Sequence, residues 1–222
     1  IFFACCFSAC VSTSLPSVII PEHPGSFDAG LSLGLIGFQA DVQYAVGSTL
    51  VAGGAYSLYT GPGPVNYGEA RLGAVVRNRS RMLTAAFGHG KFNLNIGFPT
   101  GGLDNSVDRY YGHFHKASLA WNHQHPFKKG IFGIVLQAAT WWGTGSGVCG
   151  DPGCHNEFHN RRFTLPLSLT PMFYLRVGKE REMAISGGAT LSLRSSTVGG
   201  LGDADFFLNP AVVAVGWVVP VR

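Results

Sequence analysis

Charged residues are scarce in this sequence, and no long apolar run follows its first residues. Asp, Glu, Lys and Arg together make up 13% of the 222 residues, about half the share found in an average soluble domain. Beyond the N-terminal stretch no segment of about 18 consecutive apolar residues occurs, so no transmembrane helix is predicted. The net charge of +4 is small and scattered, and no Lys/Arg cluster contains interleaved aromatic residues. This pattern argues against nucleic acid as a partner.

The sequence does contain regular alternation with a period of two. Between Thr164 and Arg194 apolar residues such as Leu169 alternate with polar or small ones such as Ser168, and a charged turn at 178–182 interrupts the pattern once. The two strands that flank this turn are longer than the usual length of about five or six residues in soluble sheets. Strands of about ten residues are those that cross a bilayer at a tilt.

Similar alternation along the chain predicts about ten strands with connections of two kinds. The connections are alternately short and long, except that the first, at 36–37, is also tight. Short periplasmic turns and longer outer loops are typical of outer-membrane barrels, whereas a soluble lipocalin-like barrel has no need of them. We predict one all-β domain over 27–222, an antiparallel transmembrane β-barrel, with eight strands as the alternative. The predicted strands are 27–35, 38–46, 49–59, 67–77, 81–90, 109–124, 130–142, 164–177, 183–194 and 206–219.

Inward positions of the predicted barrel contain small and polar residues. Both signs of charge occur among them, and mixed charges inside a narrow barrel pair with one another and fill the lumen. A wide diffusion pore is therefore not expected. The predicted polar network of the lumen consists of Asp28, Gln39, Asp41, Gln43, Glu69, Arg71, Lys116 and Arg176.

Residues 1–26 are predicted to lie outside the barrel domain. Their apolar beginning is typical of an export signal, and Phe7-Ser8-Ala9-Cys10 resembles a lipobox, in which the cysteine becomes acylated. The following residues include three prolines and are interpreted as an extended tether, with the N-terminus in the periplasm. We predict lipidation at Cys10. The alternatives are Cys5, Cys6 or no lipidated cysteine.

Three segments together resemble a known group of proteins. They are 34–45 (GLIGFQADVQYA), 67–73 (YGEARLG) and Gly88-His89-Gly90. In pattern they are similar to small outer-membrane β-barrel lipoproteins of Bacteroidota. The resemblance implies a non-catalytic structural or accessory subunit, in contact with outer-membrane lipid, lipopolysaccharide and a larger outer-membrane protein partner. It implies no catalytic residue and no cofactor, and the final residues 218–222 lack the terminal aromatic residue common in barrels.

The longest predicted outer loop contains two cysteines. Cys149 and Cys154 enclose a Pro-Gly turn, and in an oxidising export compartment such a pair is expected to form a disulfide. The alternative is a zinc site that adds His155 and His159, although the spacing is irregular for zinc.

Other polar residues near the strand ends lack the partners that catalysis or metal binding requires. A histidine pair on one strand face supplies two metal ligands, and nothing in the sequence identifies a third, so no metal site is predicted. The rim acids suggest an omptin-like protease, but the Asp-x-His pair of omptins has no counterpart, and no motif indicates a lipid hydrolase. A rim enzyme and a narrow channel stay as alternatives to the non-catalytic role. The residues concerned are His113, His115, His123, His125, Asp104, Asp108, Asp203 and Asp205.

Overall fold

All regular elements in the described part of the chain are β-strands. The structure is a computed structural model that describes residues 19–34, 37–59, 64–76, 79–97, 107–148, 158–178, 182–195 and 204–221. None of these residues forms a helix long and apolar enough to cross a membrane. The strands are β1 (Phe27–Gly34), β2 (Gly37–Ala45), β3 (Leu50–Tyr59), β4 (Val65–Val76), β5 (Arg81–Gly97), β6 (Val107–Phe127), β7 (Gly130–Val148), β8 (Phe158–Val177), β9 (Glu182–Ser195) and β10 (Ala204–Val221).

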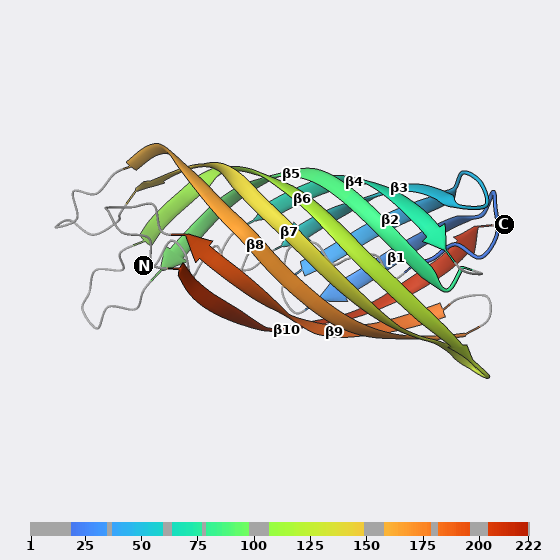
Figure 1. Cartoon of the computed structure of the whole chain (residues 1–222). Helices are drawn as coiled ribbons and strands as arrows, with labels where there is room; N and C mark the ends of the chain where they lie inside the picture. Colours follow the sequence, from blue (N-terminus) through green and yellow to red (C-terminus); the bar gives the residue numbers. More distant parts are fainter. Residues whose placement is uncertain are drawn as a thin grey trace.

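The strands form one antiparallel barrel. Each strand pairs with its neighbours in the sequence, and β10 pairs with β1 to close the sheet (Figure 1). The closing register runs from Phe27 opposite Val221 to Gly34 opposite Ala214. The predicted all-β antiparallel barrel is confirmed, and the ten strands of the described residues show that the alternative of eight is wrong.

The two ends of the barrel differ in their connections. At the end where β1 begins and β10 finishes, here called the terminal end, the strands are joined through 46–49, 77–80, 128–129 and 178–181. At the opposite end, the loop end, the connections grow from 35–36 and 60–64 to 98–106, 149–157 and 196–203. This is the length asymmetry that the sequence predicts, including the tight first turn.

Strands β5 and β6 extend further toward the loop end than predicted. The prediction ended β5 at Gly90 and began β6 at Arg109, but β5 reaches Gly97 and β6 begins at Val107. In the extension of β5, Lys91 pairs with His113 of β6. Backbone pairing therefore continues where the outward side chains become polar.

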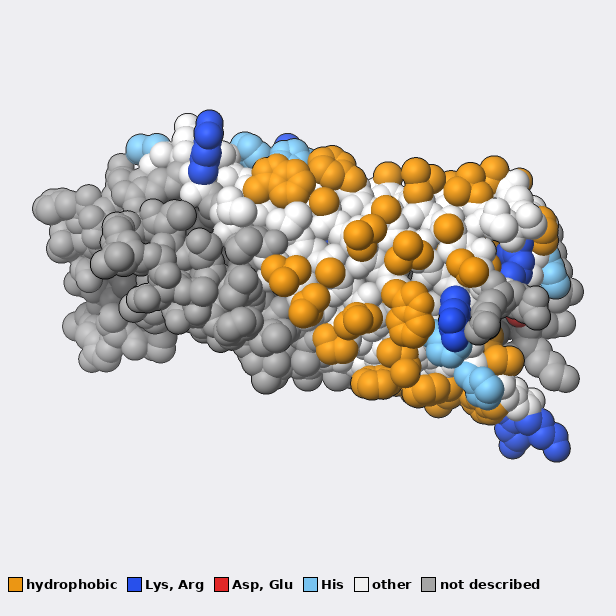
Figure 2. Space-filling model, viewed as in Figure 1, with side chains coloured by type: hydrophobic (Ala, Val, Ile, Leu, Met, Phe, Trp, Pro, Cys, Tyr) orange, Lys and Arg blue, Asp and Glu red, His pale blue; other side chains and the backbone are white. Residues whose placement is uncertain are grey.

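The barrel wall has charged residues on its inner face and large apolar residues on its outer face, which is the reverse of the arrangement in a soluble protein. In β4 every second residue from Val65 to Val75 is buried inside the barrel, and the residues between them point outward. Large apolar side chains on the outside are left exposed, with 61% of Leu72 and 57% of Leu119 accessible. Figure 2 shows apolar side chains across the middle of the wall, whereas Lys, Arg and His lie toward its two ends.

Some inward glycines make room for large rings of the lumen. A Cβ added to Gly88 would overlap the Tyr67 hydroxyl, and one added to Gly90 would overlap the ring of Phe114. The absence of a side chain at these positions of β5 allows the rings from β4 and β6 to fill the space over them.

We expect the Gly88→Ala variant to lose about 1–3 kcal/mol of unfolding free energy, because the added methyl group overpacks the core against Tyr67. Gly68→Ala is the matched control, since Gly68 lies on β4 opposite His89 and an added Cβ there would have its nearest neighbour at 3.9 Å. Urea unfolding of both variants in detergent micelles, followed by tryptophan fluorescence, measures the difference. Equal midpoints would contradict the prediction.

The first described residues pack inside the terminal end. Ile19 and Ile20 are fully buried, and Ile20 clusters with Val51, Val75 and Met82, which are inward residues of β3, β4 and β5. Ile19 packs against Ala184 of β9. The segment therefore contacts several sides of the lumen, a packing that the sequence analysis did not predict.

Arg79 ties this segment to a neighbouring turn. Its Nη1 donates a hydrogen bond of 2.7 Å to the Pro21 carbonyl, and its Nη2 donates to the carbonyls of Gly47 at 3.1 Å and Ser48 at 3.2 Å. Arg79 has a φ of 60°, a conformation uncommon for a residue with a Cβ. One guanidinium thus joins the β2–β3 turn, the β4–β5 turn and the chain before β1.

Candidate functional site

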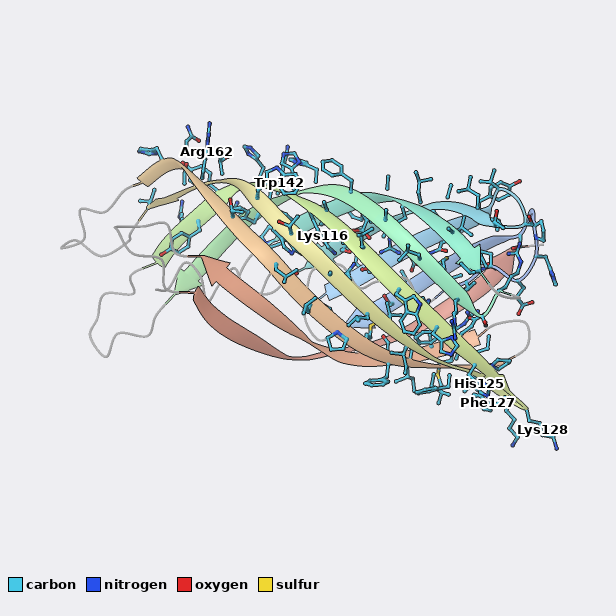
Figure 3. All side chains as sticks on the ribbon, viewed as in Figure 1. Lys116, His125, Phe127, Lys128, Trp142 and Arg162 are labelled. Atoms are coloured by element: carbon cyan, nitrogen blue, oxygen red, sulfur yellow. The ribbon has the colours of Figure 1, made fainter. Side chains whose placement is uncertain are left out.

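Many side chains of the described residues are buried inside the barrel. Each of the eight residues predicted to line the lumen is buried, and the most enclosed are Lys116, with 1% of its surface accessible, and Gln43, with 2%. Figure 3 shows Lys116 in the middle of the barrel. The remaining members are Asp28, Gln39, Asp41, Glu69, Arg71 and Arg176.

Register places a cation and an anion on the same row of the wall. Glu69 of β4 lies opposite Gly88 of β5, which lies opposite Lys116 of β6. Gly88 between them has no side chain, and Lys116 Nζ lies 3.8 Å from Glu69 Oε2. The two charged residues, which flank β5, therefore form an ion pair across three strands.

Glu69 is the centre of the charge cluster. Arg71 donates from its Nε to Glu69 Oε1 at 2.6 Å, and its Nη2 pairs with the same oxygen. Tyr67 donates its hydroxyl to Glu69 Oε2 at 2.7 Å. Arg71 Nη1 also lies 3.7 Å from Asp41 Oδ2. The cluster joins two carboxylates to two cations, so their formal charges sum to zero.

An aromatic layer lies against the charge cluster on its loop side. The rings of Tyr67 and Phe114 stack with centroids 5.6 Å apart, and Trp141 is within 5.4 Å of Phe114 and 6.1 Å of Tyr67. The Lys116 ammonium lies 5.0 Å from the Trp141 ring centroid and 5.6 Å from that of Tyr67. Trp141 Nε1 donates to Ser168 Oγ at 3.2 Å. These rings pack beside the ion pairs in the lumen and add cation–π attraction to the Lys116 ammonium.

Other buried side chains of the described lumen form neutral hydrogen bonds. Ser57 donates to Gln39 Oε1 at 3.1 Å, and Tyr174 donates to Asn122 Oδ1 at 2.8 Å. Gln43 is paired in register with Asp28, and within the described residues its side-chain amide has no hydrogen-bond partner. Arg176 is buried near the end of β8.

A small cavity lies beside the charge cluster. It has a volume of about 10 Å³, is lined by Glu69, Arg71, Thr84, Ser118 and Asn122, and has the volume needed to hold roughly one water molecule. The buried charges of this cluster therefore balance one another in a closely packed part of the described lumen.

Several candidates named in the sequence analysis lie outside the described residues. They are Cys10, Cys149, Cys154, His155, Asp104 and Asp203. Asp108 and Asp205 belong to β6 and β10, and the structure describes only their backbone pairing. His159 and His125 are exposed on β8 and β6, respectively.

The outer face of the wall brings together three histidines, one of which the sequence analysis missed. His89 of β5 lies opposite His115 of β6, with ring centroids 4.8 Å apart, and His113 is 6.0 Å from His89. Only the strand register could have revealed His89 as their neighbour. Within the described part of the chain, no group of three or more His, Cys, Asp or Glu residues is arranged to hold a metal ion.

Comparison with known proteins places the chain in no family. No protein-family model matches the sequence, and no curated protein is similar to it. The structure thus establishes an antiparallel β-barrel whose described inward residues include a buried charge cluster and whose described outer wall exposes large apolar side chains.

Proposed function

We propose that this protein is a non-catalytic β-barrel of the bacterial outer membrane, acting as a structural or accessory subunit of an outer-membrane protein assembly. The observation that supports this most directly is the inverted polarity of the wall. Each of β1 to β9 has exposed large apolar side chains on the outside, while the ion pairs lie within. In water such a wall would be an aggregation-prone surface, whereas in a bilayer it faces acyl chains.

The asymmetric ends support an orientation. Outer-membrane barrels place short turns in the periplasm and long loops outside, so the terminal end, with the chain before β1, would be periplasmic. Acylation at Cys10 would then add a second anchor on the same side. The outer loops would be available to bind a larger outer-membrane protein. The wall would contact outer-membrane lipid and lipopolysaccharide.

The filled lumen favours the structural role over a channel. A permeation path would have to pass the aromatic layer of Tyr67, Phe114 and Trp141 and then the ion pairs around Glu69. The cavity beside Glu69 has a volume of about 10 Å³, which suits one water molecule and no solute. The barrel is therefore proposed to act through its outer surfaces.

Isolation from native membranes tests the accessory role. The full chain would be extracted from outer membranes in a gentle detergent, captured by affinity, and its companions identified and quantified by mass spectrometry. A larger outer-membrane protein at a fixed stoichiometry is the expected result. Recovery of the chain alone from the outer membrane would contradict the accessory role, and its absence from that membrane would contradict the location.

A further inference from the structure

The outer wall of β5 to β8 contains a group of cationic and hydrogen-bonding side chains near the loop end. In register, Lys91 of β5 lies opposite His113, which lies opposite Thr144 of β7, which lies opposite Arg162 of β8. His89, His115 and Trp142 form the adjacent row on the same outer face. We call these seven residues the cationic rim.

The histidine, threonine and tryptophan side chains of the cationic rim contact one another, and its two cations lie on the strands at either side. His113 Nε2 and Thr144 Oγ1 are hydrogen-bonded at 3.1 Å, and the rings of His115 and Trp142 stack with centroids 5.7 Å apart. Lys91 and Arg162 are exposed. Figure 3 shows Arg162 nearer the loop end than Trp142, as expected when the rows cross a barrel of tilted strands obliquely.

The charge around the cationic rim has one sign. Arg109, further along β6, is also exposed. Among the side chains that the structure describes on β4 to β8, the acidic one is Glu69, and it is buried in the lumen. Anions approaching this face therefore meet fixed positive charge from Lys91 and Arg162 with no described carboxylate beside it.

The cationic rim borders the apolar wall directly. On the terminal side of His89 and His115 the next outward residues are Phe87, which is 55% accessible, and Ala117, which is paired with it. Leu119 follows on β6. Aromatic residues at such a border are typical of the membrane interface, and Trp142 and Phe87 have ring centroids 6.0 Å apart here.

A cationic surface next to an apolar one matches the two parts of a phosphorylated lipid, which are an anionic headgroup and apolar acyl chains. We infer that the cationic rim binds the phosphate of an anionic lipid headgroup, with the acyl chains lying along the apolar wall of β5 to β7. Lys91 and Arg162 supply the charge, and the histidine rings and the Thr144 hydroxyl supply hydrogen bonds. The inference rests on the proposed membrane location, because only in a bilayer would acyl chains cover the apolar wall beside the cationic rim.

Vesicles that contain brominated lipids test the inference, because bromine on acyl chains quenches nearby tryptophans such as Trp142. Wild-type protein is reconstituted with brominated phosphatidic acid or with brominated phosphatidylcholine, and the relative binding constants are taken from the quenching. The wild type should prefer the anionic lipid. The Lys91→Gln/Arg162→Gln variant should lose roughly fivefold of this preference for each cation removed.

The control variant removes two cations from the opposite end. Lys128 and Lys129 are exposed in the turn between β6 and β7, and Figure 3 shows Lys128 at the terminal end. Lys128→Gln/Lys129→Gln should keep the wild-type preference. An equal loss in both double variants, or no preference in the wild type, would overturn the inference.

Flotation of the vesicles distinguishes failure of the lipid site from failure of the membrane location. If the wild type floats with the vesicles but shows no anionic preference, the lipid site is wrong and the membrane location stands. If the wild type does not float, the membrane location fails, and the lipid site fails with it.

Discussion

Arginine at both Leu72 and Leu119 should prevent stable insertion of the barrel into membranes. These two leucines are among the most exposed apolar residues of the described wall, and each lies within the apolar part of its strand. An arginine facing lipid near the midplane costs about 2–4 kcal/mol, so the pair is expected to cost about 4–8 kcal/mol. Stabilities of folded domains are commonly about 5–15 kcal/mol, so a loss of this size would leave little folded barrel.

The measurement is the fraction of protein that folds into vesicles from urea, read from its altered mobility in gels without heating. Tyr111→Arg is the matched control, because Tyr111 also points outward on β6 but lies beyond His113 toward the loop end. Arginine near the interface costs only about 0–1 kcal/mol, so this variant should insert normally. Equal insertion of the Leu72→Arg/Leu119→Arg variant and the control would mean that the wall does not face lipid.

Removal of the Glu69 carboxylate should be the most damaging single change in the lumen. Glu69→Ala leaves Arg71 and Lys116 buried without their shared partner and deprives the Tyr67 hydroxyl of its acceptor. Breaking a buried ion pair from one side costs about 3–5 kcal/mol. The same geometry predicts that Lys116→Met, added to Glu69→Ala, restores part of the loss, because one of the two buried cations that Glu69 neutralises is gone.

Urea unfolding in micelles measures both variants against a neutral control. Ser57→Ala removes the hydrogen bond to Gln39, which is buried but uncharged, and should cost about 1 kcal/mol. A Glu69→Ala loss no larger than that of Ser57→Ala would show that the charge cluster contributes no more than an ordinary hydrogen bond. If Lys116→Met does not restore stability, the loss of unfolding free energy in Glu69→Ala comes from Arg71 and Tyr67 and not from Lys116.

The faces of the strands could be predicted from the sequence because alternation is local. Each residue of β4 points opposite to its neighbour, so the inward position of Glu69 and Arg71 follows once the strand is recognised. The contact of Lys116 with Glu69 is different, since it depends on which residue of β5 lies between them. A shift of one residue in register would place a side chain where Gly88 now leaves space.

Two other features differ from the sequence-based expectation for different reasons. The prediction ended β5 at Gly90, although polar and apolar residues still alternate over 91–96, and pairing with β6 continues to Gly97. Burial of Ile19 and Ile20 could not be predicted from periodicity, because two consecutive residues are too few to show a strand pattern or a helix pattern. Their burial depends on contacts with distant strands, which form only in the folded barrel.

Burial of Ile19 and Ile20 makes the chain before β1 a second link between parts of the sheet. The two residues contact β3, β4, β5 and β9 from inside, and β9 is not hydrogen-bonded to any of the other three strands. The segment therefore connects, across the lumen, strands that no backbone hydrogen bond joins. Its two isoleucines hold these strands together at the terminal end in addition to the pairing of the wall.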